Sequence, residues 1–365
     1  MVSPSPSPKI ILKGEALAKR LVKDVRTAFL RRKGNNPKNI GLLSEQGIVL
    51  GDVKEFIPTG FPNIDYQLGG GLPVGRAVEV YGPEGVGKTA LLHMALKGCQ
   101  SLGGVPVILD YEAALDMDKM FQLGIDPDRV VYLIPDHIEE GWDAIWQMMG
   151  VLERETPPAP VLFGWDSIAA SVPEAELREK SSGSVHVGLI ARSMSKGCRK
   201  MYKAVARTRA CMLWINQIRE KIGVMGFGDK YTTVGGRAVR FASSIRVNIA
   251  YRRIMKDGAR KIGYEAFLRT VKNKLFPPHR ETSFVIDFEH GPSPELTVLH
   301  HLIQARKIKA TGDGKFAGVW SPLKFDKRDV WFACLGDPEF RAGALATYLE
   351  LIKSSQTTGE EEDEE

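Results

Sequence analysis

This chain of 365 residues has few cysteines and lacks a long hydrophobic run. Its four cysteines lie far apart, and because no two of them form a Cys-x-x-Cys pair, neither a disulfide framework nor a cysteine metal site is expected. No stretch approaches the ~20 continuous apolar residues of a membrane-spanning helix. Residues 1–8, which end in Ser-Pro repeats, lack the apolar core of a signal peptide. These absences predict a cytoplasmic protein with reduced thiols and no membrane partner.

The charge of the chain is unevenly distributed. The formal net charge is +6, but the last six residues are all acidic, so the rest of the chain carries +12. A basic body favours a polyanion as partner, and an acidic tail would compete with that partner. The alternative is that residues 360–365 only keep the chain end solvated. Composition leaves both interpretations open.

Residues 82–89, Gly-Pro-Glu-Gly-Val-Gly-Lys-Thr, fit the nucleotide-binding pattern G-x-x-x-x-G-K-[ST] without a mismatch. The apolar run 77–81 predicts a strand that enters this loop, and residues 90–97 predict a helix that leaves it. In that context the glycines let backbone N–H groups converge on phosphate, and the start of the helix adds a partial positive charge. The loop therefore predicts binding of a nucleoside triphosphate, with Lys88 on the β- and γ-phosphates and Thr89 on Mg²⁺. The expected contacts are Gly82, Pro83, Glu84, Gly85, Val86, Gly87, Lys88, Thr89 and Ala90.

The core alternates apolar runs with helical segments, which predicts the α/β class. Residues 105–110, 161–166 and 211–216 are near-continuous apolar runs, as expected for strands of a mostly parallel sheet covered on both faces. Runs at 244–251, 264–271 and 283–288 predict a later, antiparallel extension. Ligands bind at the carboxyl ends of the strands in such sheets. Five polar residues should therefore converge beside the phosphate loop, namely Asp110, Glu112, Asp166, Asn216 and Gln217.

Two carboxylates are candidates for chemistry. Asp166, followed by Ser167, ends its strand where a second Mg²⁺-site carboxylate is expected to hold a metal-bound water. A helix N-cap is the alternative role. Glu112 lies just past its strand, where it could orient and deprotonate the water that attacks the γ-phosphate. Asp110 competes for that role, and an ordinary surface acid is the alternative.

A long glycine-containing segment follows Asn216 and Gln217. Residues 218–236 mix basic side chains with apolar and aromatic ones, a combination that suits single-stranded nucleic acid. Gln217 at its root could sense the γ-phosphate and couple the nucleotide to the order of the loop. Residues 186–207 predict a helix with one apolar and one basic face. A mobile surface loop and a solvated helix face are the alternatives.

The composition of successive segments divides the chain into four expected parts. Residues 14–32 repeat an apolar side chain every four positions among basic ones, which predicts an amphipathic helix. The parts are an N-terminal disordered segment with this helix (1–50), an ATPase core (51–293), a small C-terminal α/β domain (294–353) and an acidic disordered tail (354–365).

Taken in order, these motifs resemble the bacterial RecA recombinases. The matching segments run along most of the chain, at residues 69–76, 82–89, 110–116, 166–170, 188–192, 216–225, 232–236 and 271–274. The phosphate-loop motif is shared by many ATPases. By contrast, Asn-Gln-Ile-Arg at 216–219 with its glycine-rich loop, and Lys-Asn-Lys at 272–274, are far more specific.

The resemblance implies a RecA-type P-loop ATPase core with an N-terminal helix and a small C-terminal domain. It implies an ATP-dependent recombinase that forms filaments on single-stranded DNA and exchanges strands with a duplex, in recombination and repair. The expected place is the cytoplasm of a bacterium or of a phage-infected host. Mg-ATP would be held by Lys88, Thr89, Asp116 and Asp166. Glu112 would activate the attacking water, and Gln217 would read the γ-phosphate. Lys272 and Lys274 would reach the ATP from the next subunit.

The resemblance also implies how DNA is bound. The loops at 175–187 and 218–236 would line the filament axis, and the N-terminal helix would dock on the next protomer. A single-strand binding protein and loader proteins are further expected partners. Arg199 and Arg219 are the foremost expected phosphate contacts. The full set of expected DNA-binding residues is Arg192, Arg199, Arg219, Lys221, Phe227, Gly235, Gly236 and Arg237.

Two features depart from the family pattern. Lys119 stands where well-known members have a tyrosine that stacks on adenine, and the segment before Gly235 is one residue longer. A divergent, phage-encoded member fits these departures. Two other functions remain open: a hexameric translocating helicase, which would need an arginine finger in a ring interface, and an accessory paralogue that binds DNA without exchanging strands. Lys272 and Lys274 favour the filament.

Overall fold

A computed structural model describes residues 14–30, 53–155, 157–178, 188–220, 231–257, 259–311, 313, 315–325 and 328–361. Its internal contacts divide the chain into two units, residues 1–53 and 54–365. In the first unit, helix α1 (Gly14–Leu30) is the amphipathic helix that the sequence predicts, and Leu21 and Val25 on it are 55% and 41% exposed. Among the described residues, none of the helices is long and apolar enough to cross a membrane.

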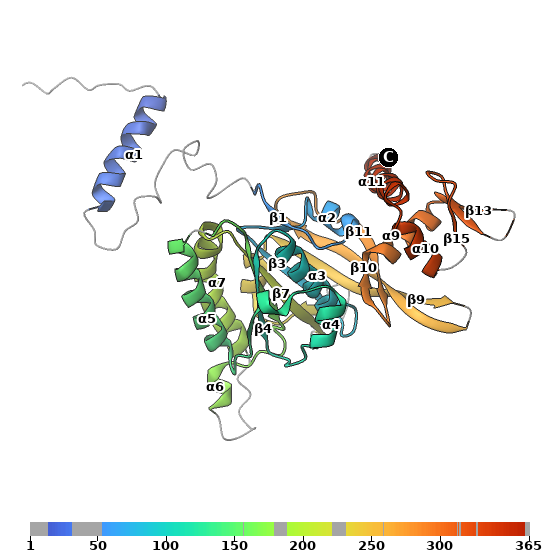
Figure 1. The fold of residues 1–365 in the computed structure, drawn as a ribbon. Coiled ribbons are helices and arrows are strands. Elements are labelled where there is room, and N and C mark those ends of the chain that lie inside the picture. Colours follow the sequence, from blue (N-terminus) through green and yellow to red (C-terminus); the bar gives the residue numbers. More distant parts are fainter. Residues whose placement is uncertain are drawn as a thin grey trace, which may run out of the picture. The chain divides into compact units, whose positions relative to one another are not determined.

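The second unit is built on a sheet of ten strands within the described residues (Figure 1). Its parallel strands are, in spatial order, β9 (Ile245–Asp257), β3 (Ala77–Gly82), β7 (Ala210–Glu220), β6 (Val161–Asp166), β4 (Val105–Asp110) and β5 (Val131–Leu133). Beyond β9, β10 (Arg260–Asn273), β11 (Glu281–Asp287) and β12 (Gly291–Ser293) extend it antiparallel, and β8 (Tyr231–Thr233) pairs with β7. The predicted fold class is confirmed.

Helices cover both faces of the parallel strands, and each face has its own core. On one face α2 (Pro62–Leu68), α3 (Lys88–Ser101) and α4 (Met117–Gln122) pack on Val80 and Leu213. On the other, α5 (Ile138–Glu155), α7 (Leu189–Arg207) and α8 (Gly236–Ala242) pack on Trp165 and Trp214. Successive side chains of a strand point to opposite faces, so the fully buried strand β6 supplies both cores. The short elements are β1 (Phe56–Ile57), β2 (Leu72–Pro73) and α6 (Glu174–Leu177).

The C-terminal part has a core of its own. Its helices are α9 (Pro294–Gln304), α10 (Arg328–Leu335) and α11 (Pro338–Glu361), and its small sheet is β13 (Ile308–Ala310), β14 (Phe316–Gly318) and β15 (Lys324–Phe325). Trp331, Phe340 and Tyr348 form the centre of this core. Its contacts place it in the same unit as the sheet.

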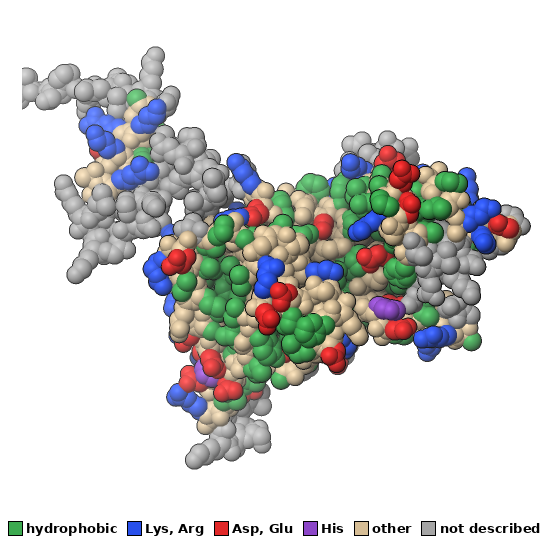
Figure 2. Space-filling view, viewed as in Figure 1, with side chains coloured by type: hydrophobic (Ala, Val, Ile, Leu, Met, Phe, Trp, Pro, Cys, Tyr) green, Lys and Arg blue, Asp and Glu red, His purple; other side chains and the backbone are tan. Residues whose placement is uncertain are grey.

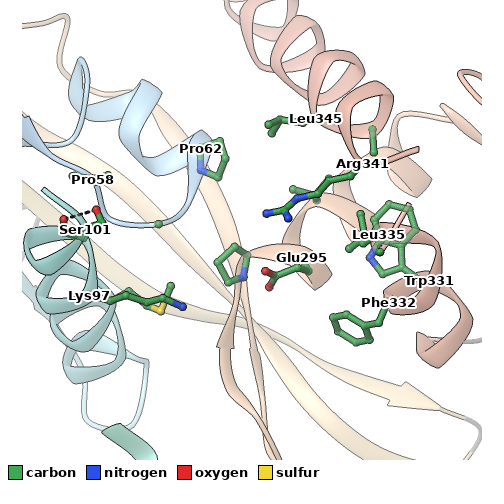
Figure 3. A pocket seen from close by; sticks show the side chains of 17 residues that line it. Pro58, Pro62, Lys97, Ser101, Glu295, Trp331, Phe332, Leu335, Arg341 and Leu345 are labelled. Atoms are coloured by element: carbon green, nitrogen blue, oxygen red, sulfur yellow. Dashed lines mark hydrogen bonds between the residues drawn. The ribbon is translucent and has the colours of Figure 1, made fainter. Parts of the chain in front are cut away.

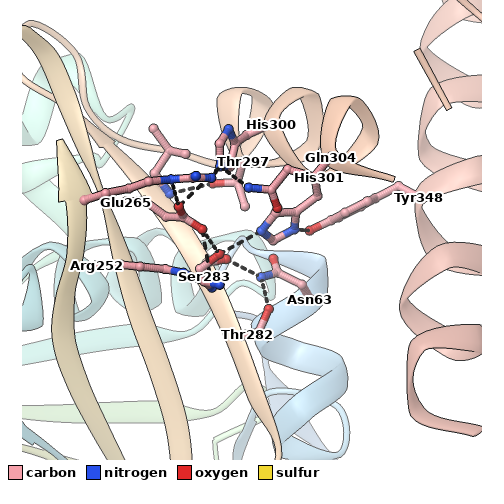
Figure 4. A network of polar contacts seen from close by, with 12 residues as sticks. Asn63, Arg252, Glu265, Thr282, Ser283, Thr297, His300, His301, Gln304 and Tyr348 are labelled. Atoms are coloured by element: carbon pink, nitrogen blue, oxygen red, sulfur yellow. Dashed lines mark hydrogen bonds and ion pairs between the residues drawn. The ribbon is translucent and has the colours of Figure 1, made fainter. Parts of the chain in front are cut away.

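A polar network joins the C-terminal part to β10 and β11 (Figure 4). The two ring nitrogens of His301 lie 2.7 Å from the hydroxyl of Tyr348 on α11 and 2.9 Å from Oγ of Ser283 on β11. Ser283 Oγ in turn donates to Oε1 of Glu265 at 2.5 Å. Glu265 is fully buried on β10, and its Oε2 accepts from Nε of Arg253 at 2.6 Å. The network therefore fixes α9 and α11 to the antiparallel end of the sheet.

Helix α11 departs from the prediction for the chain end. It continues to Glu361, whereas the sequence suggested a disordered tail from residue 354, so that prediction is wrong for residues 354–361. Adding residues to an existing helix fixes only one residue for each new hydrogen bond, and serine, threonine and glutamine are tolerated there. Residues 362–365 lie outside the described chain.

Candidate nucleotide and nucleic-acid site

Polar residues meet at the carboxyl edge of adjacent strands, as the sequence predicts. Gly82, the last residue of β3, lies opposite Gln217 of β7 in the parallel ladder. Asp110 of β4 lies opposite Asp166 of β6 in the same way. Because β3, β7, β6 and β4 are neighbours in that order, the phosphate loop and both carboxylate strand ends share one edge.

The phosphate loop joins β3 to α3, and its glycines lie where a side chain would clash. Gly87 caps α3 with a φ of +98°, and a Cβ there would lie 2.2 Å from Cδ1 of Ile286. A Cβ on Gly82 would lie 2.0 Å from the carbonyl oxygen of Ile249. The loop is thus packed directly against β9 and β11, an approach that only glycine allows.

Lys88 is the first residue of α3, and only 7% of it is exposed. Its ammonium donates to the carbonyl oxygen of Pro83 in the same loop at 2.5 Å. Burial lowers the pKa of Lys88, and the carboxylates of Asp166, Glu112 and Glu84 oppose this shift. The ammonium is therefore held over the loop, where it can meet the β- and γ-phosphate oxygens of a nucleotide.

Thr89 and Asp166 could supply oxygen ligands for a divalent cation. The Thr89 hydroxyl donates to Oδ2 of Asp166 at 2.8 Å, and within the described residues the buried Oδ1 of Asp166 has no hydrogen-bond partner. Burial raises the pKa of Asp166 to about 6, against the hydrogen bond from Thr89. A turn rather than a helix follows Asp166, so the N-cap role does not apply.

An unpartnered carboxylate oxygen beside a hydroxyl fits Mg²⁺, a hard cation that takes few protein ligands and otherwise keeps waters and phosphate oxygens. The described part of the chain contains no group of three or more His, Cys, Asp and Glu residues that could hold a metal by themselves. A cation at Thr89 and Asp166 would therefore depend on phosphate oxygens for the rest of its ligands.

Asp110 and Glu112 have different partners, which separates their roles. The carboxylate of Asp110 accepts the backbone N–H groups of residues 112, 114 and 115 at 3.0–3.2 Å, and the hydroxyl of Tyr132 at 3.0 Å. It shapes the turn that carries Glu112. Glu112 is exposed, and its Oε1 accepts from Oγ of Ser167 at 2.6 Å. Of the two acids, Glu112 is better placed to contact a water above the phosphate loop.

Comparison with known sequences identifies this arrangement. The family model described as RecA N-terminal domain matches residues 43–293, more than half of the chain. The Protein RecA of Streptomyces avermitilis is 42% identical over 276 residues, which cover 75% of this chain and 69% of the relative. That of Leifsonia xyli is 39% identical over 259 residues, 71% of this chain and 70% of the relative. The chain belongs to the RecA family.

As a RecA-family protein, the chain is a DNA-dependent ATPase, an ATP-dependent recombinase of DNA recombination and repair. The hexameric helicase and the accessory paralogue are not favoured. The family match spans the phosphate loop, both carboxylates, Gln217 and the two lysines of the Lys-Asn-Lys segment. The roles of these individual residues rest on the geometry around them.

The RecA-type lysines lie at the end of β10. Nζ of Lys272 donates to the carbonyl oxygens of Arg240 and Ser243 at 2.7 and 2.6 Å, at the end of α8. Burial, together with the neighbouring charges of Lys274 and Arg246, lowers the pKa of Lys272 to about 8, and Glu79 opposes this shift. Lys274 is exposed. The segment thus presents one lysine to solvent and holds the other beside the sheet.

The expected DNA-binding residues gather around α7, α8 and the β7–β8 ladder. A Cβ on Gly236 would lie 2.8 Å from Cβ of Ala191, so the start of α8 packs on the first turn of α7, next to the exposed Arg192. Gly235 caps α8 with a φ of +84°. Arg199 follows Arg192 at seven residues on α7, ~10 Å further along the same side.

The structure describes two more of the expected DNA-binding residues, and two others lie outside the described residues. Arg219 is exposed on β7 opposite Thr232 of β8, and Arg237 is exposed in the first turn of α8. Lys221 and Phe227, as well as residues 179–187 of the other expected loop, lie outside the described residues.

Sequence reasoning missed an aromatic group beside the phosphate loop. The Tyr264 hydroxyl donates to the carbonyl oxygen of Gly85 at 2.9 Å, and the ring of Phe288, which is 56% exposed, lies 6.0 Å from the Tyr264 ring. Asp116 caps α4 and pairs with the exposed Lys119 at 3.5 Å. The sequence predicts only that Tyr264 and Phe288 lie in strands. No local sequence pattern indicates that β10 passes beside the phosphate loop.

A separate pocket of about 670 Å³ lies at the other end of α3 (Figure 3). Lys97 and Ser101 of α3, Pro58, and Trp331 and Arg341 of the C-terminal helices are among its lining residues. The lining includes none of the residues predicted to bind nucleotide or DNA. This pocket is therefore distinct from the candidate site.

Proposed function

We propose that the chain binds Mg-ATP between neighbouring subunits of a helical filament on single-stranded DNA, and that hydrolysis releases the DNA. The observation that carries this proposal is the position of Gln217. It lies opposite Gly82 at the phosphate loop and, three residues later, β7 leads into residues 221–230, which are part of the expected DNA loop at 218–236. One strand therefore connects the nucleotide with the DNA.

Within the site, each residue has a task that its contacts support. Lys88 binds the β- and γ-phosphates, and Thr89 and Asp166 hold Mg²⁺, which neutralises charge on the phosphates when bound. Glu112 orients and deprotonates the attacking water, and Gln217 reads the γ-phosphate. Hydrolysis removes the group that Gln217 contacts, so the order of the adjoining loop changes with the state of the nucleotide.

For the base, we propose contacts from two sides. The exposed ring of Phe288 lies beside the phosphate loop, next to Tyr264, and offers a face for stacking. The turn at Gly291 packs on α4, since a Cβ on Gly291 would lie 3.8 Å from Leu123. Asp116 at the start of α4 can then accept from the amino group of adenine. Lys119, which replaces the tyrosine, takes no stacking role.

Exposed apolar surface supports assembly into a filament. Strand β5 ends the sheet, and Val131 and Tyr132 on it are 42% and 41% exposed, beside an apolar cavity of about 310 Å³. On the face drawn in Figure 2, hydrophobic side chains also gather over α4, where Phe121 is 60% exposed. An exposed sheet edge of this kind suits a protein partner. Leu21 and Val25 of α1 present a second apolar stripe, for the next protomer.

In the filament, we propose that Lys272 and Lys274 reach the ATP of the neighbouring subunit. Arg192, Arg199, Arg219 and Arg237, with Lys221 and Phe227, contact the DNA backbone and bases, and Gly235 and Gly236 let the backbone approach closely. A cytoplasmic site of action, and cooperation with a single-strand binding protein and loaders, follow from the family resemblance.

The test combines two assays on the purified protein. ATP hydrolysis is measured with and without single-stranded DNA, and joint-molecule formation is measured with a homologous duplex. We expect hydrolysis that depends on DNA, joint molecules, and helical filaments in electron micrographs with a slowly hydrolysed ATP analogue. Closed rings, or stimulated hydrolysis without joint molecules, would refute the proposal in favour of a translocase or an accessory paralogue.

A further inference from the structure

Glu79 is a fully buried carboxylate in the middle of β3, the strand that leads into the phosphate loop. Its Oε1 accepts from Nδ2 of Asn216 at 2.9 Å, and its Oε2 accepts from Nε of Arg246 at 2.6 Å. The guanidinium of Arg246 also lies 4.6 Å from the centre of the Tyr81 ring. A charge this deeply buried is costly unless it is fully paired, and Glu79 is paired on both oxygens.

The carboxylate sets the orientation of the Asn216 side chain. An ionised carboxylate can only accept hydrogen bonds, so the amide of Asn216 must turn its NH₂ group toward Glu79. That NH₂ group also donates to the carbonyl oxygen of Val234 at 2.9 Å, and Oδ1 is left to accept the backbone N–H of Gln217 at 2.9 Å. Asn216 therefore ties Gln217 to Val234, which lies just past β8.

On its other side, Glu79 lies in the same row across the sheet as Lys272. Glu79 lies opposite Arg246 in the β3–β9 ladder, and Arg246 lies opposite Lys272 in the β9–β10 ladder. Residues directly opposite each other point to the same face of a sheet. The three side chains therefore form one transverse row with Lys272 at its outer end, and Asn216, which lies opposite Tyr81 in the β3–β7 ladder, meets Glu79 diagonally.

We propose that Glu79 is a positioning residue that couples the DNA loop to the nucleotide, resting on the proposed function above. Through Asn216 it holds the backbone of Gln217 beside the phosphate loop and closes the base of the β7–β8 ladder. On its other side it pairs with Arg246, and so fixes the charge that lies opposite Lys272, the lysine assigned to the neighbour's ATP. A change at the DNA loop is thereby transmitted to both nucleotide contacts through a single buried charge.

The substitution that tests this is Glu79→Gln, which keeps size and shape but removes the charge. A glutamine can turn its own NH₂ group toward Asn216, so the amide of Asn216 is no longer fixed and the N–H of Gln217 loses its acceptor. We expect ATP binding without DNA to stay within about twofold. The DNA-stimulated turnover number should fall at least about fivefold, the low end of measured coupling between linked sites.

Glu265→Gln is a matched control. Glu265 is also fully buried in the sheet and also accepts from an arginine Nε at 2.6 Å. Its other contacts are Ser283 and His300 in the C-terminal network and a second arginine, Arg252, at 3.6 Å. Both variants lose one buried carboxylate, so both should lose stability. Only Glu79→Gln should change the ratio of DNA-stimulated to unstimulated turnover.

If Glu79→Gln does not fold, the double variant Glu79→Gln with Arg246→Gln removes both charges and avoids a buried unpaired arginine. It should show the same loss of stimulation. A wild-type protein without DNA stimulation would overturn the proposed function and this inference together. A stimulated wild type with equal stimulation in the folded Glu79 variant, or an equal loss in Glu265→Gln, would overturn the inference alone.

Discussion

Acidification should weaken the attachment of the C-terminal helices through His301. Ser283 donates its hydroxyl proton to Glu265, so its oxygen accepts from Nε2–H of His301, and Nδ1 of His301 accepts from the hydroxyl of Tyr348. The neutral imidazole of His301 can therefore make both of its hydrogen bonds, one as donor and one as acceptor. Burial lowers the pKa of His301 to about 4 from 6.5, with His300 adding to the shift and Glu265 opposing it.

The sign and size follow from linkage. Since the folded-state pKa is below the unfolded value, the unfolded state binds more protons between pH 6.5 and 4, and stability is lost as pH falls through that window. The full shift corresponds to ~3.4 kcal/mol at 1.36 kcal/mol per pKa unit, of which ~1.4 kcal/mol is lost by pH 5.5. In the variant His301→Gln this dependence disappears.

The assay is urea unfolding of wild type and His301→Gln at pH 7.5 and pH 5.5. The free energy of unfolding of the wild type should fall by ~1.4 kcal/mol more than that of the variant between the two pH values. The comparison cancels the contributions of three other buried groups, because these groups are the same in both proteins. They are His93, whose pKa is lowered to about 4, and Asp65 and Asp166, whose pKa values are raised to about 6. An equal change in the free energy of unfolding between the two pH values, for wild type and His301→Gln, would refute the reasoning.

Three predictions concern the nucleotide site itself. Lys88→Ala should weaken ATP binding at least about tenfold in calorimetric titration, because a charged hydrogen bond contributes ~1.5–3 kcal/mol; unchanged affinity would contradict the phosphate-loop assignment. Glu112→Gln should keep ATP and DNA binding but slow hydrolysis at least about 100-fold, the usual effect of losing a general base, and near-normal turnover would remove Glu112 from that role. Gly87→Ala should lower the free energy of unfolding by ~1–3 kcal/mol and reduce ATP affinity, because its positive φ and the 2.2 Å approach to Ile286 leave no room for a Cβ; a stable variant with normal affinity would show that the loop adapts.

The sequence predicted best where a local pattern was sufficient. The strands 105–110 and 161–166 have the predicted bounds, because an apolar run that ends in a carboxylate is visible locally. The same logic predicted that Gln217 and Asp166 would meet near the phosphate loop. Strand β7 is longer than predicted, since its last residues pair with β8, across the segment 221–230.

Long-range partners were beyond this reasoning. Glu79 lies inside the apolar run 77–81 and was not singled out, because its partner Arg246 lies 167 residues later in the chain. Likewise, the separate roles of Asp110 and Glu112 depend on Tyr132 of β5 and on Ser167, which directly follows β6. Such pairings are set by tertiary packing, which propensity and periodicity do not contain.

The packing of the phosphate loop has a consequence for synthesis of the protein. The loop is made early, yet Gly82 rests on Ile249, Gly85 bonds to Tyr264, and Gly87 abuts Ile286. At ~5–20 residues per second, a ribosome needs ~10–40 s to reach Ile286 after making Gly87. Until β9, β10 and β11 have emerged, a nascent chain carries the complete motif without the surface that shapes it. We therefore expect ATP to stabilise the protein only once β9, β10 and β11 are in place.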